Sequence, residues 1–354
     1  MSYKSRRSRR NWIIAACVII IAAMLTWQFW PRGSTPTAPD ANSPSGSTDA
    51  NDGTGQLSTG GTDANATVPP GPANPNVDPN NDISRLQSVP AVQAVAMVAE
   101  GNKLLAEKKF AEGRALLSKA LLSGNLGEAT AETVRGKLEA LAEKMIFSRQ
   151  IFDGDPYTLQ YAFASGEVLV KVERKLALHV PTQILLKING ITRAESIRAG
   201  QMLKVIQGPF HAIVDKSDFT MDIFLHRKGF EPAYVKRLRV GLGKNSSTPV
   251  GMWRLRLGSK RNRAPWFPPP SAEAQRSIQW GDPGYPLGKM GYWIGLEKID
   301  DNTSRYEGYG IHGTNDLSSI GKAASLGCIR LADEDIDLVF SVLYEKWSTV
   351  SVRP

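Results

Sequence analysis

Residues 312–331 read HGTNDLSSIGKAASLGCIRL, and the interpretation of the whole 354-residue chain depends on this stretch. It contains Cys328, one of two cysteines in the chain, and His312, one of four histidines, sixteen positions earlier. A thiol becomes a strong nucleophile when a base removes its proton, and a histidine brought close by the fold can be that base. Gly313 and Gly327 stand beside the two groups, and glycine allows close backbone approach. A lone cysteine is alternatively a small buried hydrophobic residue, so the residues alone leave both interpretations open.

A known family offers a match to both ends of this stretch. The string His-Gly-Thr, a loop, and then Ser-x-Gly-Cys-Ile-Arg-Leu resembles the signature of YkuD-type L,D-transpeptidase catalytic domains. Leu326 departs from it, because many members have histidine there. Residues 248–251 (TPVG) and 286–288 (PLG) are similar to two further elements of these domains. The resemblance thus covers residues 210–353 and implies a mainly-β catalytic domain, an L,D-transpeptidase β-sandwich.

The resemblance also implies catalytic roles. The Cys328 thiolate would attack the carbonyl of the third residue of a peptidoglycan stem peptide and release the terminal D-alanine. His312 would take the thiol proton, with the main-chain carbonyl of Gly313 fixing its tautomer. Backbone N–H groups near Gly327 and Cys328 would hold the oxyanion.

Substrate-binding roles follow in the same way. Arg330 suits a bidentate contact with a substrate carboxylate, and its alternative is an ion pair with nearby acids. Ser325, Gly327 and Thr314 are expected to shape the loop that meets the substrate. The thioester would pass to an amine of a neighbouring stem, which makes a 3–3 cross-link. Transfer to water (L,D-carboxypeptidase) or attachment of a protein to peptidoglycan uses the same thioester, and a non-catalytic peptidoglycan-binding scaffold is the alternative of another class.

Charge and hydropathy patterning predict the location of the chain. Six of its nine net positive charges fall in residues 1–32, so the remaining +3 gives no argument for nucleic acid as a partner. Residues 11–30 carry no charge and, as a helix, would have the length of a membrane span behind a basic cytoplasmic tail, residues 1–10. The sequence therefore predicts a single-pass anchor in the cell membrane with an extracytoplasmic catalytic portion; a cleaved signal peptide is the alternative. No cofactor is implied, and the absence of clustered cysteine and histidine ligands disfavours zinc.

Three further segments precede the catalytic region, so a multidomain chain is predicted. Residues 31–82 are rich in Pro, Gly, Ser, Thr, Asn and Asp and are expected to form a disordered linker. Residues 83–150 show helical spacing and include a stretch that resembles one tetratricopeptide-type helical hairpin, an all-α segment that spaces or docks. Residues 155–207 resemble a LysM module, a small α+β (βααβ) domain, which implies peptidoglycan glycan strands as a second partner. The alternative for this module is a connector without sugar affinity, and the oligomeric state is left open.

Two local expectations concern the surroundings of the site. The segment 261–285 is rich in proline and tryptophan and is expected to form a loop over the cleft, with Trp266, Phe267 and Trp280 as cover residues; simple loop packing is the alternative. Asp333 is expected to cap a helix that follows the motif. The other histidines, at positions 179, 211 and 226, are interpreted as packed or surface residues.

Overall fold

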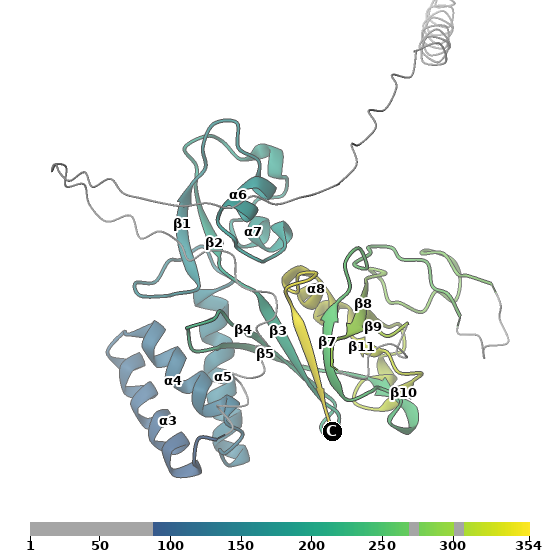
Figure 1. The fold of residues 1–354 in the computed structure, drawn as a ribbon, viewed down its shortest axis with the longest axis horizontal. Helices are drawn as coiled ribbons and strands as arrows, with labels where there is room; N and C mark the ends of the chain where they lie inside the picture. Colours follow the sequence, from purple (N-terminus) through teal and green to yellow (C-terminus); the bar gives the residue numbers. More distant parts are fainter. Residues whose placement is uncertain (1–87, 269–275, 301–307) are drawn as a thin grey trace, which may run out of the picture. The chain divides into compact units, whose positions relative to one another are not determined.

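The computed structural model describes residues 88–268, 276–300 and 308–354 (Figure 1). The predicted basic tail 1–10, anchor 11–30 and linker 31–82 all lie outside these ranges. Within them, no helix is both long and apolar enough to cross a membrane. The longest is the 18-residue α5 (Glu128–Met145), which carries charges along its length, whereas a span needs about 20 apolar residues. On this finding the predicted cell-membrane localisation is wrong.

Three helices open the described chain: α3 (Ala91–Ala106), α4 (Phe110–Leu122) and α5. The first two pack closely because glycine stands where they cross. A methyl group added at Gly101 would lie 2.9 Å from a side-chain carbon of Leu117, closer than packed carbons approach. Leu117, Leu138 and their neighbours then form a buried cluster between α4 and α5.

These helices dock on β5 (Ala233–Arg239), the last strand of the large sheet. Ser118 Oγ accepts a hydrogen bond from the backbone N–H of Tyr234 at 3.1 Å. Glu139 Oε1 accepts one from the backbone N–H of Arg237 at 3.0 Å. An edge strand otherwise exposes unpaired N–H groups to other chains, so the helices protect this edge.

A small unit with strand–helix–helix–strand order follows. Asn189 ties its second helix to its second strand, because its side chain donates to the carbonyl of Leu185 at 2.8 Å and to that of Lys204 at 2.7 Å, and accepts from the Lys204 N–H at 2.9 Å. The likeness to a LysM module stays a prediction. The elements are β1 (Thr158–Ala162), α6 (Leu169–Lys175), α7 (Thr182–Ile188), η1 (Ala194–Ser196) and β2 (Met202–Ile206), and β1 pairs antiparallel with β2.

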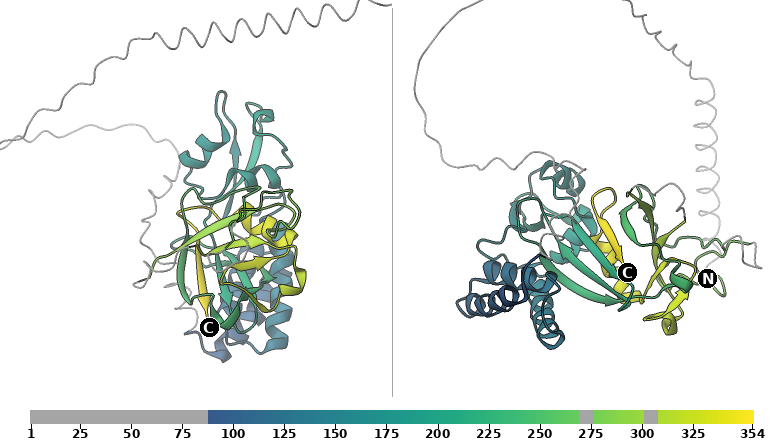
Figure 2. Two further views of the ribbon diagram at one scale, coloured as in Figure 1. Left: turned by 90° about the vertical axis from the view of Figure 1, so that its right-hand side faces the viewer. Right: turned by 60° about the horizontal axis from the view of Figure 1, so that its bottom comes forward.

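The region from residue 210 onward is mainly β, and eight of its strands join into one mixed sheet of order β11-β9-β8-β7-β12-β3-β4-β5. The C-terminal strand β12, yellow in Figures 1 and 2, lies between β3, its parallel partner, and β7, its antiparallel partner. Its residues are buried almost throughout, as expected for a central strand. The strands are β3 (Phe210–Asp215), β4 (Thr220–Leu225), β5, β7 (Gly251–Leu255), β8 (Trp293–Lys298), β9 (Gly310–Gly313), β11 (Ile329–Leu331) and β12 (Thr349–Arg353).

The two ends of this sheet meet. Gly241, just after β5, exchanges two backbone hydrogen bonds of 2.9 and 2.8 Å with Arg330 in β11. A methyl group at Gly241 would lie 2.5 Å from the Ser319 carbonyl oxygen, so glycine permits this contact. A two-stranded parallel pair, β6 (Leu242–Gly243) with β10 (Ala323–Ser325), and the short helices η2 (Lys244–Ser246) and η4 (Leu317–Ser319) complete this junction.

Helix α8 (Asp333–Val342) follows β11, and its start differs from the expectation. Ala332 occupies the N-cap position, and no side chain caps the helix. The Asp333 carboxylate instead accepts a hydrogen bond from the backbone N–H of Lys289 at 2.9 Å. The prediction that Asp333 caps the helix is wrong, because its carboxylate holds the loop that contains residues 286–288.

Candidate active site

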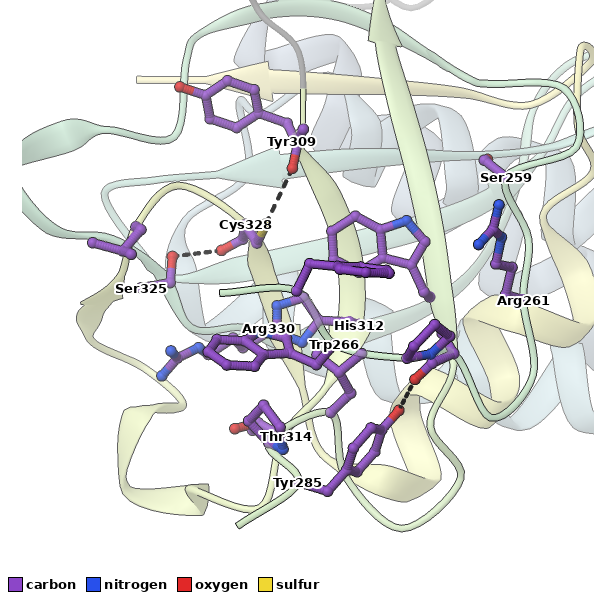
Figure 3. Close-up of a pocket in the computed structure, with 18 of the residues that line it drawn as sticks. Ser259, Arg261, Trp266, Tyr285, Tyr309, His312, Thr314, Ser325, Cys328 and Arg330 are labelled. Carbon is purple, nitrogen blue, oxygen red and sulfur yellow. Dashed lines mark hydrogen bonds between the residues drawn. The ribbon is translucent and has the colours of Figure 1, made fainter. Parts of the chain in front are cut away.

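Three neighbouring strands bring the predicted site residues to one face of the sheet. In the register, Arg330 of β11 stands opposite His312 of β9, which stands opposite Trp293 of β8. Side chains directly opposite one another point to the same face. Cys328 comes two positions before Arg330 and, because side chains alternate along an extended chain, belongs to that face too. Figure 3 shows Cys328, His312 and Arg330 around one cavity.

The orientation of His312 is fixed by its own backbone and by an aromatic ring. Its Nδ1–H donates to the carbonyl oxygen of Gly313 at 2.7 Å, which leaves Nε2 as the nitrogen able to accept a proton. The imidazole stacks on the Trp293 indole, with centroids 5.6 Å apart. Gly310 makes room for that indole, since an added methyl group would lie 2.7 Å from it. The contact that the family resemblance implied for Gly313 is present.

The surroundings of His312 and Cys328 favour the neutral form of both side chains. Burial lowers the pKa of His312 to about 4; the hydrogen bond to Gly313 opposes this shift, and the Arg330 guanidinium adds to it. Burial raises the pKa of the Cys328 thiol above its usual value, against smaller opposing effects of the Gly310 backbone and Arg330. The thiol Sγ lies 3.8 Å from the carbonyl oxygen of Gly308. A thiolate that exists before substrate binds is therefore disfavoured in this environment.

The catalytic turn, residues 325–328, is held by side chains on both sides. Ser325 Oγ donates to the carbonyl oxygen of Cys328 at 2.7 Å and accepts from the N–H of Gly327 at 3.0 Å. Thr248 Oγ1 donates to the carbonyl oxygen of Gly327 at 2.9 Å and accepts from the N–H of Gly243 at 2.8 Å. Hydrogen bonds thus hold the turn together and attach it to residues 248–251 (TPVG).

This network corrects one expected role. The Gly327 N–H is engaged by Ser325 Oγ and is not available as an oxyanion donor. Gly327 serves the turn through its backbone conformation: its φ is +133°, and a methyl group there would lie 2.5 Å from the Tyr309 ring. Of the two predicted amides, that of Cys328 is the one that Ser325 does not occupy.

Arg330 and Thr314 lie beside the cavity at its other edge. A guanidinium nitrogen of Arg330 lies 3.9 Å from an Asp316 carboxylate oxygen, a loose ion pair between partly exposed groups. Its Nε is buried and has no hydrogen-bond partner among the described residues. Thr314 shapes the adjoining loop: its Oγ1 accepts from the Asp316 N–H at 3.1 Å, and its own N–H donates to the Leu331 carbonyl at 3.1 Å.

A cavity of about 1100 Å³ joins these groups. Trp266 and Phe267 line it, as expected for cover residues, whereas Trp280 does not. The Trp280 indole N–H donates to the Lys289 carbonyl at 3.0 Å, and Arg263 stacks on its ring at 4.2 Å, so its expected role is replaced by loop packing. The principal polar and aromatic lining residues are Arg256, Ser259, Arg261, Tyr285, Trp293, Tyr309, His312, Thr314, Asn315, Asp316, Ser325, Cys328 and Arg330.

Several of these residues were missed by the sequence analysis. Thr248 belongs to a quoted motif, and only the fold places its hydroxyl on the catalytic turn. Trp293 lies in a strand whose register with His312 the sequence does not give. The remaining histidines lie elsewhere: His179 stacks on Trp347, and His211 is buried beside Thr349. Within the described ranges, no three His, Cys, Asp or Glu side chains are grouped to hold a metal ion.

Comparisons with known proteins agree on one family. The YkuD family model, the L,D-transpeptidase catalytic domain, matches residues 209–352. A putative L,D-transpeptidase YkuD of Bacillus subtilis is 28% identical over 193 residues, which cover 52% of this chain and 93% of that protein. A putative L,D-transpeptidase YqjB of the same organism is 30% identical over 140 residues, 39% of this chain and 68% of that protein.

Solved structures of L,D-transpeptidases also align with part of this chain. An L,D-transpeptidase from Mycobacterium smegmatis aligns with 44% of this chain and 64% of its own, at 13% identity and a TM-score of 0.31. L,D-transpeptidase 3 from Mycobacterium tuberculosis, in complex with a faropenem-derived adduct, aligns with 56% of this chain and 92% of its own, at 15% identity and a TM-score of 0.30.

Proposed function

The chain belongs to the L,D-transpeptidase family, with a YkuD catalytic domain over residues 209–352, and from this premise we propose that it cross-links peptidoglycan stem peptides through a thioester on Cys328. The observation that supports the proposal is that His312 lies in β9 and Cys328 directly precedes its partner strand β11, with His312 Nδ1 held by its own backbone. That arrangement gives the thiol an oriented base. The catalytic domain fits an extracytoplasmic location, where peptidoglycan is assembled.

Acylation begins from the neutral pair. Cys328 Sγ forms a bond to the carbonyl carbon of the third stem residue while His312 Nε2 takes the thiol proton. The intermediate collapses by breaking the bond to the terminal D-alanine, whose nitrogen receives that proton from His312. D-Alanine leaves as the free amino acid, and the stem remains on Cys328 as a thioester. Because both groups start neutral, charge develops only as the bond forms.

Transfer is the reverse sequence with a new amine. A side-chain amine of a neighbouring stem attacks the thioester carbonyl and gives a proton to His312. The carbon–sulfur bond breaks, and Cys328 recovers the proton as the 3–3 cross-link is released. Water in place of the amine trims the stem, and a protein amine attaches that protein to peptidoglycan; the identity of the released product separates these three reactions.

Two binding groups complete the proposal. The Cys328 N–H stabilises the oxyanion in each half-reaction, because Ser325 already holds the neighbouring Gly327 amide. Arg330 binds a substrate carboxylate, which competes with Asp316 for the guanidinium; an ion pair of 3.9 Å between partly exposed groups is weak enough to be displaced. Residues 155–207 bind glycan strands and keep the enzyme near its substrate.

Intact mass spectrometry tests this function. The full chain is mixed with a disaccharide-tetrapeptide, and Cys328→Ala is treated in parallel. The expected result is an adduct equal to the substrate minus D-alanine on the wild type alone, with D-alanine in solution. A folded wild-type protein that forms no adduct and releases no D-alanine would leave the non-catalytic scaffold as the better description.

A further inference from the structure

Four side chains form one cross-strand row along the floor of the cavity. Arg261 exchanges two backbone hydrogen bonds with Trp293, of 2.9 and 3.0 Å, and the register continues from Trp293 to His312 and on to Arg330. Residues paired in this way share a face, so an arginine stands at each end of the row. With about 4.8 Å between neighbouring strands, the two arginines are about 14 Å apart. Figure 3 shows Arg261 and Arg330 on opposite sides of the cavity.

A second guanidinium joins Arg261 at its end. An added methyl group at Gly295 would lie 3.2 Å from a guanidinium nitrogen of Arg256 and 2.8 Å from the Ser259 side chain. Gly295 is two positions from Trp293 in the same strand, so this contact lies on the cavity face. Arg256, Ser259 and Arg261 all line the cavity, and we call these three residues the far wall.

The far wall carries charge that the described protein does not neutralise. Neither Arg256 nor Arg261 makes a side-chain hydrogen bond or ion pair with another described residue. Among the described lining residues, Asp316 is the only acid, and it faces Arg330. Two guanidinium groups that line the same cavity without a described counter-charge attract an anion, and guanidinium donors suit a carboxylate.

We propose that the far wall is a second carboxylate subsite, which binds a free carboxylate of a stem peptide while the reacting carbonyl lies at Cys328. This inference rests on the proposed function and adds a recognition element to it. An extended peptide advances about 3.4 Å per residue, so the row, about 14 Å long, accommodates about four residues of bound peptide. The carboxylate belongs either to the donor stem or to the acceptor stem, and the two half-reactions distinguish them.

The test measures acylation and transfer separately in the full chain. Single-turnover mass spectrometry gives the rate of thioester formation from a tetrapeptide donor, and a second mixing step gives the rate of transfer to an acceptor stem. In the Arg256→Gln/Arg261→Gln double variant, we expect a loss of about 10- to 100-fold in one of the two second-order rate constants. A loss in acylation assigns the carboxylate to the donor, and a loss in transfer assigns it to the acceptor.

Amidated peptides distinguish carboxylate binding by Arg256 and Arg261 from a purely structural role, because a structural role would not make the rate depend on the carboxylate. Wild type should lose the same factor when that carboxylate is converted to an amide, and the double variant should not distinguish the two peptides. Arg263→Gln is the matched control, because Arg263 is an exposed arginine two positions away that stacks on Trp280 outside the cavity. Equal rates for the double variant and wild type would overturn the subsite. So would a loss in the double variant, relative to wild type, that is as large with the amidated peptide as with the free peptide.

A binding experiment distinguishes a failure of the subsite proposal from a failure of the proposed function. Calorimetry on Cys328→Ala, with and without the two arginine substitutions, measures peptide affinity without chemistry. Weaker binding of the free peptide, and not of its amide, supports the subsite even where wild type forms no thioester. Unchanged affinity together with normal wild-type acylation rejects the subsite and leaves the transpeptidase function standing.

Discussion

The two ends of the active-site cavity are built differently. In the catalytic turn, Ser325 and Thr248 pair the Gly327 N–H, the Gly327 carbonyl and the Cys328 carbonyl within the protein. In the far wall, the Arg256 and Arg261 guanidinium groups are exposed and make no such pairs with other described residues. A nucleophile must be held to a fraction of an ångström, whereas a binding group gains from keeping its charge for the ligand. Substitutions in the turn should therefore change rate constants, and those in the wall should change binding.

The largest effect is expected at His312. His312→Ala removes the base and should slow acylation by about 10²- to 10⁴-fold. Peptide affinity should stay close to that of wild type, because the arginines at both ends of the row remain. Single-turnover mass spectrometry and calorimetry measure the two quantities on the same samples. An acylation rate within tenfold of wild type would show that another group accepts the thiol proton.

Gly327→Ala should damage the turn itself. The residue would be forced into a backbone region that side chains rarely adopt, with its methyl group 2.5 Å from the Tyr309 ring, so we expect unfolding to be easier by about 1–3 kcal/mol and acylation to be slowed at least tenfold. Gly124→Ala is the control: its φ is also positive, at +71°, and nothing lies within 4 Å of the added group. Denaturant unfolding of both variants compares them, and equal losses would mean that the Tyr309 contact adds nothing.

Thr248→Val tests the support of the turn from outside. Valine has nearly the same shape but leaves the Gly327 carbonyl and the Gly243 N–H without their partner, so we expect a loss of about 1–3 kcal/mol in stability. Acylation should slow by less than in Gly327→Ala, since Ser325 still holds the turn from within. Thr248→Ser keeps the hydroxyl and should recover most of both quantities. Denaturant melts and single-turnover rates of the two variants provide the measurement, and a serine variant as impaired as the valine one would contradict the role of the hydroxyl.

The site motif was predictable because its main residues lie close together in sequence. His312 and Gly313 lie in β9, Arg330 lies in its partner strand β11, and Cys328 directly precedes β11, so a twenty-residue stretch contains both the proposed nucleophile and its base. The mainly-β class followed from alternation in several strands. What the sequence did not supply was register, which alone places Trp293 opposite His312.

Three local expectations about polar groups differ from the structure for one physical reason: another partner competes for the group. The Gly327 amide was expected to face the substrate, but the Ser325 hydroxyl two positions away takes it. The Asp333 carboxylate was expected to cap its helix, but the Lys289 amide from a distant loop takes it. The Trp280 indole was expected over the cleft, and the Lys289 carbonyl takes its N–H. Each partner is identified by the three-dimensional arrangement and not by local propensity.

Among the aromatic residues that line the cavity, Trp266→Ala should have a moderate effect on binding alone. Trp266 lines the cavity and packs on the cluster formed by Ala264, Tyr285 and Leu287, so its loss removes apolar contact area and leaves the catalytic turn intact. We expect peptide affinity to fall by less than about tenfold, with the acylation rate at saturating peptide unchanged. A lower saturating rate would mean that this ring also positions the reacting carbonyl. Phe267→Ala, at an exposed ring that also lines the cavity, provides the comparison.

The smallest effect is expected from pH, and it separates a neutral pair from a preformed ion pair. His312 with a pKa of about 4 is an unprotonated base at every higher pH, and the raised pKa of Cys328 keeps the thiol protonated through neutrality. The acylation rate should therefore vary less than about twofold between pH 5 and 8, and fall as pH drops through about 4.

A thiolate–imidazolium pair would instead raise the pKa of His312 above its ordinary value of 6.5, so the acylation rate would fall toward alkaline pH as the imidazolium loses its proton. Stability must be followed in parallel, because the unfolded chain binds a proton at His312 below pH 6.5 and the folded chain does so only near pH 4. The stabilising effect of the neutral, buried imidazole is thus complete above pH 6.5 and is lost progressively as pH falls toward 4. Acylation rates that decline only where the protein also begins to unfold would support the neutral pair. A decline in rate between pH 5 and 8 in folded protein would support the ion pair instead.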